Sequence, residues 1–74
     1  MKELIELLNE IKPDVDYSEE KNLIDDGILD SLDVVSLVSE INDRFDVEIG
    51  LDDLTPENFD SAEAIYTLIE RLKG

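Results

Sequence analysis

The sequence contains no cysteine and no histidine among its 74 residues. Without cysteine it has neither a disulfide framework nor a thiolate zinc site, and cysteine usage does not fix its compartment. Without histidine it lacks the side chain that proteins use most often as a general base and as a metal ligand. A chain this short, with no glycine-rich phosphate loop, also leaves little room for a substantial pocket. We therefore expect that the protein is not an enzyme.

Basic residues are scarce as well, because six lysines and arginines stand against 21 aspartates and glutamates and give a formal net charge of -15. This charge repels nucleic acid phosphates and anionic lipids, so we expect basic proteins as partners, no nucleic acid and no membrane insertion. No uninterrupted apolar run is long enough for a signal sequence or a membrane span. We expect a soluble, monomeric, cytoplasmic protein.

Hydrophobic residues make up 42% of the chain, which is enough for one small core despite the acidity. A chain of this length is near the size where burial of apolar surface only just offsets the loss of conformational entropy. We expect a single domain over residues 1–74.

Apolar residues at helical spacing predict helices over residues 2–11, 31–45, 56–60 and 62–72. Pro13 ends the first helix, and Thr55-Pro56 and Ser61 are typical helix starts. Residues 13–30 form a long, partly buried loop, with a short helical turn near 18–22 as one option. Residues 46–51 alternate like a strand without a partner, so we expect a loop anchored by Val47 and Ile49. The predicted fold is all-α, a small four-helix bundle of three longer helices and one short helix with a long first loop.

The helix predicted over residues 31–45 has two distinct faces. Its core stripe consists of Val34, Leu37, Val38, Ile41 and Phe45. Leu32 falls almost opposite this stripe and Val35 lies on its flank, so we expect Leu32 to be at least partly exposed as a contact for another protein. The alternative is that Leu32 folds back against Ile28 or Leu29 as a hydrophobic staple.

Ser31 and Asp30 compete for the N-cap of this helix. Isolated serines at helix starts are usually caps, but Asp30 followed by Asp33 resembles a capping box. If Asp30 is the cap, the Ser31 hydroxyl is free at the first helical position. A free hydroxyl without a neighbouring base is a poor nucleophile, and no lysine lies near Ser31 in the sequence. We therefore interpret Ser31 as a substrate of another enzyme.

The surroundings of Ser31 are strongly acidic, with twelve acidic residues and one basic residue, Arg44, between Asp25 and Asp60. Such a charge makes encounters with a basic partner fast and sensitive to salt. The alternative is that the acidic surface only keeps a small domain soluble. The spacing required for a calcium-binding EF-hand loop is absent, and we predict no metal site.

The motif Asp30-Ser31-Leu32, preceded by Gly27 and opening an acidic helix, resembles the acyl carrier proteins over nearly the whole chain. The resemblance implies that Ser31, flanked by Asp30 and Leu32, carries 4'-phosphopantetheine, taken from coenzyme A by a magnesium-dependent phosphopantetheinyl transferase. The thiol of this arm would hold acyl or aminoacyl cargo as a thioester. The protein would then be a non-catalytic carrier that other enzymes modify and load.

The same resemblance implies a docking surface on the second helix for a ligase, synthase or transferase with a basic docking surface. This surface would consist of Leu32, Val35, Asp30, Asp33, Glu40 and Asp43. A rival hypothesis is an acidic interaction protein with no prosthetic group, for which Ser31→Ala would leave function intact.

The cargo is open at this point. Ile28-Leu29 before the motif, and Ser36 and Ser39 on the acidic face, depart from the carriers of fatty acid biosynthesis in primary lipid metabolism. The stretches 27–32 and 54–61 resemble freestanding carriers paired with an adenylating ligase, including D-alanyl carriers. Residues Ile49, Phe59, Ile65 and Leu68 could line a space for an acyl chain or form ordinary core.

Overall fold

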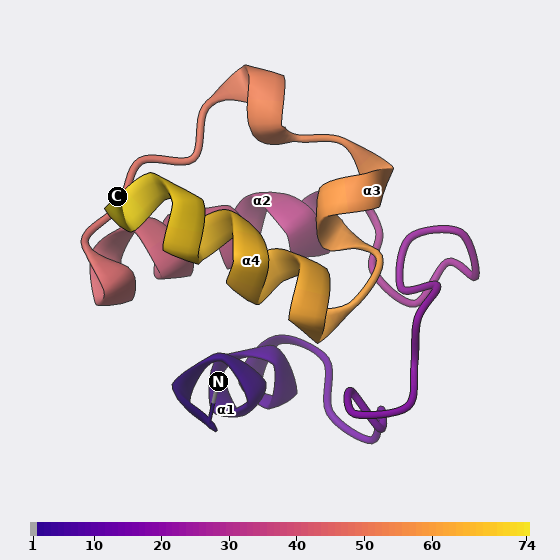
Figure 1. Ribbon diagram of the computed structural model, residues 1–74. Helices are drawn as coiled ribbons and strands as arrows, with labels where there is room; N and C mark the ends of the chain where they lie inside the picture. The colour runs from indigo at the N-terminus through magenta and orange to yellow at the C-terminus, as the bar shows by residue number, and fades with distance from the viewer. Residues whose placement is uncertain (1) are drawn as a thin grey trace.

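Within residues 2–74, the part of the chain that this computed structural model describes, there are four α-helices, one short 3-10 helix and no strand. The helices are α1 (Lys2–Ile11), α2 (Ser31–Phe45), η1 (Leu51–Asp53), α3 (Pro56–Phe59) and α4 (Ala62–Lys73). Helix α1 packs against α2 and α4, and the short α3 packs against α4 (Figure 1). The predicted all-α four-helix fold with a long first loop is confirmed. No helix in the described range combines the length and apolarity needed to cross a membrane.

The helix boundaries follow the capping residues of the sequence. Asp30 caps α2, because its Oδ1 accepts the Asp33 N–H at 2.9 Å while Asp33 Oδ2 accepts the Asp30 N–H at 3.3 Å. Ser61 caps α4 by accepting the Ala64 N–H at 3.0 Å. Helices α1 and α2 therefore match their predicted ranges, while α3 ends one residue before residue 60 and α4 continues one residue past 72.

Two details of the connections differ from the prediction. The option of a short helical turn near residues 18–22 is met only by a single turn over residues 17–19, in which the Glu20 N–H donates to the Asp16 carbonyl oxygen at 2.9 Å and the Asp16 carboxylate accepts the Ser18 N–H at 3.1 Å. The 3-10 helix η1 was not predicted, since a single short turn leaves no apolar period in a sequence. The loop before it behaves as expected, with Val47 and Ile49 both buried.

The core is formed by all four α-helices and by anchors from the loops. Of the stripe predicted on α2, Leu37 and Ile41 are fully buried, while Val34, Val38 and Phe45 pack against the core at its edge. Val34 and Phe45 are only partly buried because each also lines a surface hollow. The predicted core face is confirmed, and the buried part of it is narrower than the apolar pattern indicates. Ile49, Phe59, Ile65 and Leu68 are all core residues.

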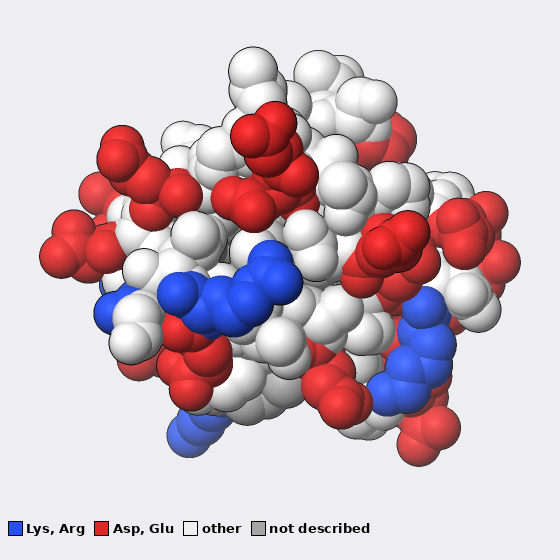
Figure 2. Space-filling model, turned by 45° about the horizontal axis from the view of Figure 1, so that its top comes forward, with Lys and Arg blue, Asp and Glu red and all other residues white. Residues whose placement is uncertain are grey.

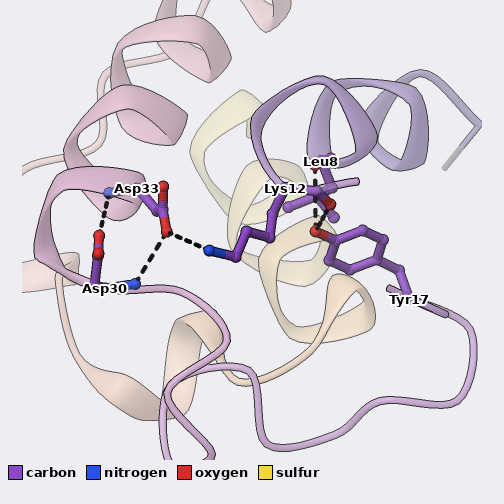
Figure 3. Close-up of polar contacts among 5 residues, drawn as sticks. All are labelled: Leu8, Lys12, Tyr17, Asp30 and Asp33. Atoms are coloured by element: carbon purple, nitrogen blue, oxygen red, sulfur yellow. Dashed lines mark hydrogen bonds and ion pairs between the residues drawn. The ribbon is translucent and has the colours of Figure 1, made fainter. Parts of the chain in front are cut away.

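The long loop between α1 and α2 is fixed at several points. The Tyr17 hydroxyl lies 2.6 Å from the Lys12 carbonyl oxygen and 3.2 Å from that of Leu8, so it donates to the end of α1 (Figure 3). Burial raises the pKa of Tyr17, and the Asp33 carboxylate adds to this effect. Farther along, Gly27 adopts a φ of 73°, a left-handed conformation that glycine accepts without strain. These contacts bring the loop back to the start of α2.

Candidate functional site

Ser31 is the first residue of α2 and is exposed. Because Asp30 supplies the cap, the helix does not need the Ser31 hydroxyl, and no hydrogen bond within residues 2–74 involves it. The N-cap of α2 is therefore Asp30 and not Ser31. The Ser31 hydroxyl is free to accept a covalent group from another enzyme.

An open groove of about 530 Å³ lies beside Ser31. One side comes from the long loop with Ile24, Gly27 and Leu29, and a second from the first turns of α2. The segment 54–56, together with Phe59 of α3, completes the lining, which is mainly apolar. Sequence reasoning did not place this segment next to Ser31, because the juxtaposition depends on how α3 folds over α4 and has no local signal.

The capping box makes the carboxylate next to Ser31 more acidic. The Asp33 backbone N–H lowers the pKa of Asp30 most, and the Leu32 backbone N–H and the charge of Lys12 act in the same direction. Lys12 also lies 3.8 Å from Asp33 Oδ2, so the end of α1 is joined to the first turn of α2 (Figure 3). Asp30 therefore remains ionised at neutral pH and keeps its hold on the helix start.

Both apolar residues predicted for docking are on the surface. Leu32 is 78% exposed and Val35 is 64% exposed. This exposure confirms the expectation for Leu32 and rules out the alternative in which Leu32 folds back as a staple. Val35 also lines the groove beside Ser31, so the two exposed side chains lie close to the predicted attachment residue. Their role in docking stays a prediction.

The acidic residues predicted for docking differ in their surroundings. Asp33 is held by the capping box and Lys12, and Glu40 accepts from Arg44 Nε at 3.2 Å. Arg44 also binds both carboxylate oxygens of Glu10 on α1, at 3.0 and 3.2 Å.

Asp43 is exposed, and the described part of the chain gives its carboxylate no hydrogen bond or ion pair. Asp43 could therefore bind a basic group of another protein without first breaking a hydrogen bond or an ion pair within the described chain. Figure 2 shows acidic side chains in several separate groups on one face, with uncharged surface and a few basic side chains between them. The negative charge is thus spread widely and is not confined to α2.

The residues around Ser31 fit a covalently attached, flexible arm. The hydroxyl is exposed and unused, and the adjoining apolar groove gives such an arm a surface on which to lie. Within residues 2–74, no cluster of three or more aspartate or glutamate side chains could hold a metal ion. The site therefore provides an attachment point at Ser31 and an apolar groove beside it that an attached arm could contact.

The comparisons with known proteins agree with this geometry. The family described as "Phosphopantetheine attachment site" matches residues 2–69. D-alanyl carrier proteins of Streptococcus gordonii, Streptococcus sanguinis and Streptococcus thermophilus are each 29% identical to this chain over 73 residues. Each alignment covers 97% of this chain and 92% of the relative.

These matches establish the class of protein and its cofactor. Members of the family carry 4'-phosphopantetheine covalently, attached by a phosphopantetheinyl transferase, and are carriers and not catalysts. A role in fatty acid biosynthesis, which the acyl carrier resemblance also allows, gains no support, because these relatives are D-alanyl carriers. By its match over residues 2–69, this chain belongs to the family of carrier proteins with a phosphopantetheine attachment site.

Proposed function

We propose that Ser31 is the residue that carries 4'-phosphopantetheine, and that the protein carries a small aminoacyl group, D-alanyl or one similar to it. The observation that supports the attachment most directly is the exposed Ser31 hydroxyl, which is released from capping by Asp30. In the attachment reaction, Ser31 Oγ forms a phosphodiester with the pantetheine phosphate of coenzyme A. The pyrophosphate bond breaks, 3',5'-adenosine diphosphate leaves, and the serine proton is released.

The D-alanyl carriers among its relatives support the choice of cargo. An adenylating ligase would activate the amino acid with ATP, releasing pyrophosphate, and would pass the aminoacyl group to the thiol of the arm as AMP leaves. The arm supplies the thiol, which forms the thioester, and the protein supplies the attachment point and the surface that the ligase recognises.

The cargo is tested by loading the holo protein. We expect that ATP, D-alanine and the ligase of a streptococcal D-alanyl carrier add the mass of one alanyl residue, which hydroxylamine then removes. Fragmentation of the loaded protein should place the modification on Ser31 and not on Ser36 or Ser39. If a working streptococcal control is loaded and this holo protein is not, while a fatty acid and an acyl carrier synthetase do load it, the proposed cargo is wrong.

The docking surface of the ligase is proposed to include Leu32 and Val35, because both are exposed near Ser31. We expect Leu32→Ala and Val35→Ala each to lower kcat/KM of loading by about tenfold, as truncation of a central interface residue commonly does. The matched control is Leu51→Ala, because Leu51 is 87% exposed and belongs to η1 and not to α2. An equal loss in all three variants would contradict a docking surface on α2.

A further inference from the structure

We infer that Leu29 and Phe59 close the groove beside Ser31 against the core, so that this carrier accepts a short cargo and does not shelter a long alkyl chain between its helices. This inference rests on the proposed attachment at Ser31 and narrows the class of cargo. It concerns the floor of the groove, which sets how far a chain attached at Ser31 could penetrate.

The first observation is the identity of the residues that line the groove. Of the buried core residues in the described chain, only Leu29 and Phe59 also line it. Leu29 is 2% exposed and Phe59 is 1% exposed, so each is packed from below and presents one side to the groove. The deeper core residues Leu37, Ile41 and Leu68 do not line the groove. The groove is therefore a surface feature with a closed floor.

The second observation is that the backbone ties the two floor residues together. The Leu29 N–H donates to the Leu23 carbonyl oxygen at 2.9 Å, and the Leu23 N–H donates to the Asp60 carbonyl oxygen at 2.8 Å. Asp60 follows Phe59 directly, at the end of α3. Leu23 is itself fully buried. Two consecutive backbone hydrogen bonds, through Leu23, thus connect Leu29 in the long loop to Asp60 at the end of α3.

A long alkyl chain could enter the core only by displacing this floor. Phe59 is one of the largest fully buried side chains, and moving it would open a cavity in a closely packed interior. Moving Leu29 would also disturb the two backbone hydrogen bonds that connect it through Leu23 to Asp60. A short cargo requires neither movement, because it can remain in the open groove or in solvent.

The test loads Ser31 with cargo of different lengths and measures thermal stability. A broad-specificity phosphopantetheinyl transferase transfers acetyl- or octanoyl-phosphopantetheine from the corresponding coenzyme A thioester, and intact mass confirms that each sample is loaded. An octanoyl chain buried in the core would raise Tm above that of the acetyl form by more than about 10 °C. We expect the two forms of the wild type to agree within about 2 °C.

Variants of the floor make the test specific. Phe59→Ala opens the floor, and Phe59→Leu is measured beside it because the larger truncation could prevent folding. In the variant that folds, we expect the octanoyl form to exceed the acetyl form in Tm by more than about 5 °C. The control is Leu4→Ala, a core truncation on α1, which should show no dependence on cargo length.

Three outcomes decide the inference. A large gain in Tm for octanoyl wild type would overturn it, and so would the absence of any length dependence in both Phe59 variants. Failure of the transferase to load the wild type at all would instead contradict the proposed attachment at Ser31, which keeps the two proposals separable.

Discussion

Asp30 and Ser31 are neighbours with different tasks at the start of α2. Asp30 holds the helix through the capping box with Asp33, while Ser31 occupies the first helical position with its hydroxyl unused. A capping aspartate directly before the serine proposed for attachment therefore holds the helix start and leaves the serine side chain exposed. In the proposed attachment, the position of Ser31 makes its hydroxyl accessible to another enzyme.

The lowered pKa of Asp30 predicts a dependence of stability on pH. A carboxyl whose folded-state pKa lies below its unfolded value stabilises the folded state above the unfolded value, and this contribution disappears as pH falls through the folded-state value. The difference in unfolding free energy between wild type and Asp30→Ala should therefore be constant at neutral pH and shrink below the ordinary aspartate pKa of 3.8.

Urea denaturation between pH 3 and pH 7 measures this difference. Asp30→Asn is the matched control, because it retains a capping side chain and loses the titration. A difference that stays the same, or grows, as pH falls would show that the Asp30 charge does not stabilise α2.

Sequence reasoning succeeds for residues whose environment is local. The capping box and the exposure of Leu32 could be predicted because both depend on spacing within one helix. The ion pairs of Lys12 with Asp33 and of Arg44 with Glu10 could not, because they join residues far apart in the sequence. The first pair engages Asp33 and the second engages Arg44, each from outside α2, and a helical projection of α2 alone does not reveal either contact.

At the scale of elements, the segment from η1 to α3 differs from the longer helices. Helix α3 has four residues, and η1 leaves Leu51 almost fully exposed. Phe59 is the buried anchor of this segment, whereas α4 buries Ala62, Ile65, Leu68 and Ile69. The segment that forms one wall of the groove is therefore held by fewer core contacts than the helices beneath it.

Amide hydrogen exchange should show this difference directly. We expect residues 51–60 to exchange through local opening, about 100-fold or more faster than the central amides of α2, which would open only on global unfolding. Residues 31–45 in the same sample are the internal control. Equal protection of the two segments would mean that the groove wall unfolds only with the whole bundle.

The elements also show where prediction from sequence stops. The ranges of α1 and α2 follow from apolar spacing and capping residues, whereas η1 has no periodic signal. The groove was not predicted, because its walls come from the long loop, α2 and the segment before α3. The tertiary arrangement that joins these walls is fixed by the hydrogen bonds from Leu29 and Leu23, which a pattern of residue types does not encode.

At the scale of the whole molecule, the charge of -15 opposes folding by self-repulsion. The ion pairs in the described structure involve exposed or partly exposed side chains and contribute little to stability. Salt should therefore stabilise the protein, because it screens the repulsion more than it weakens favourable contacts. We expect Tm to rise by several degrees between about 0.01 M and about 1 M sodium chloride, where the Debye length falls from about 30 Å to about 3 Å.

A variant with less charge provides the comparison for this effect. Asp25→Asn, Asp26→Asn and Asp43→Asn together remove three exposed charges and should reduce the salt-dependent rise in Tm. A fall in Tm with added salt would show that the exposed ion pairs outweigh the net repulsion.

The most direct test of the carrier function is the intact mass of the protein after incubation with coenzyme A, magnesium and a broad-specificity phosphopantetheinyl transferase. We predict that the wild type and Ser36→Ala each gain the mass of one phosphopantetheine and that Ser31→Ala gains none. An unmodified wild type beside a fully modified control carrier, or a Ser31→Ala variant that is still modified, would contradict the assignment of Ser31 as the attachment residue.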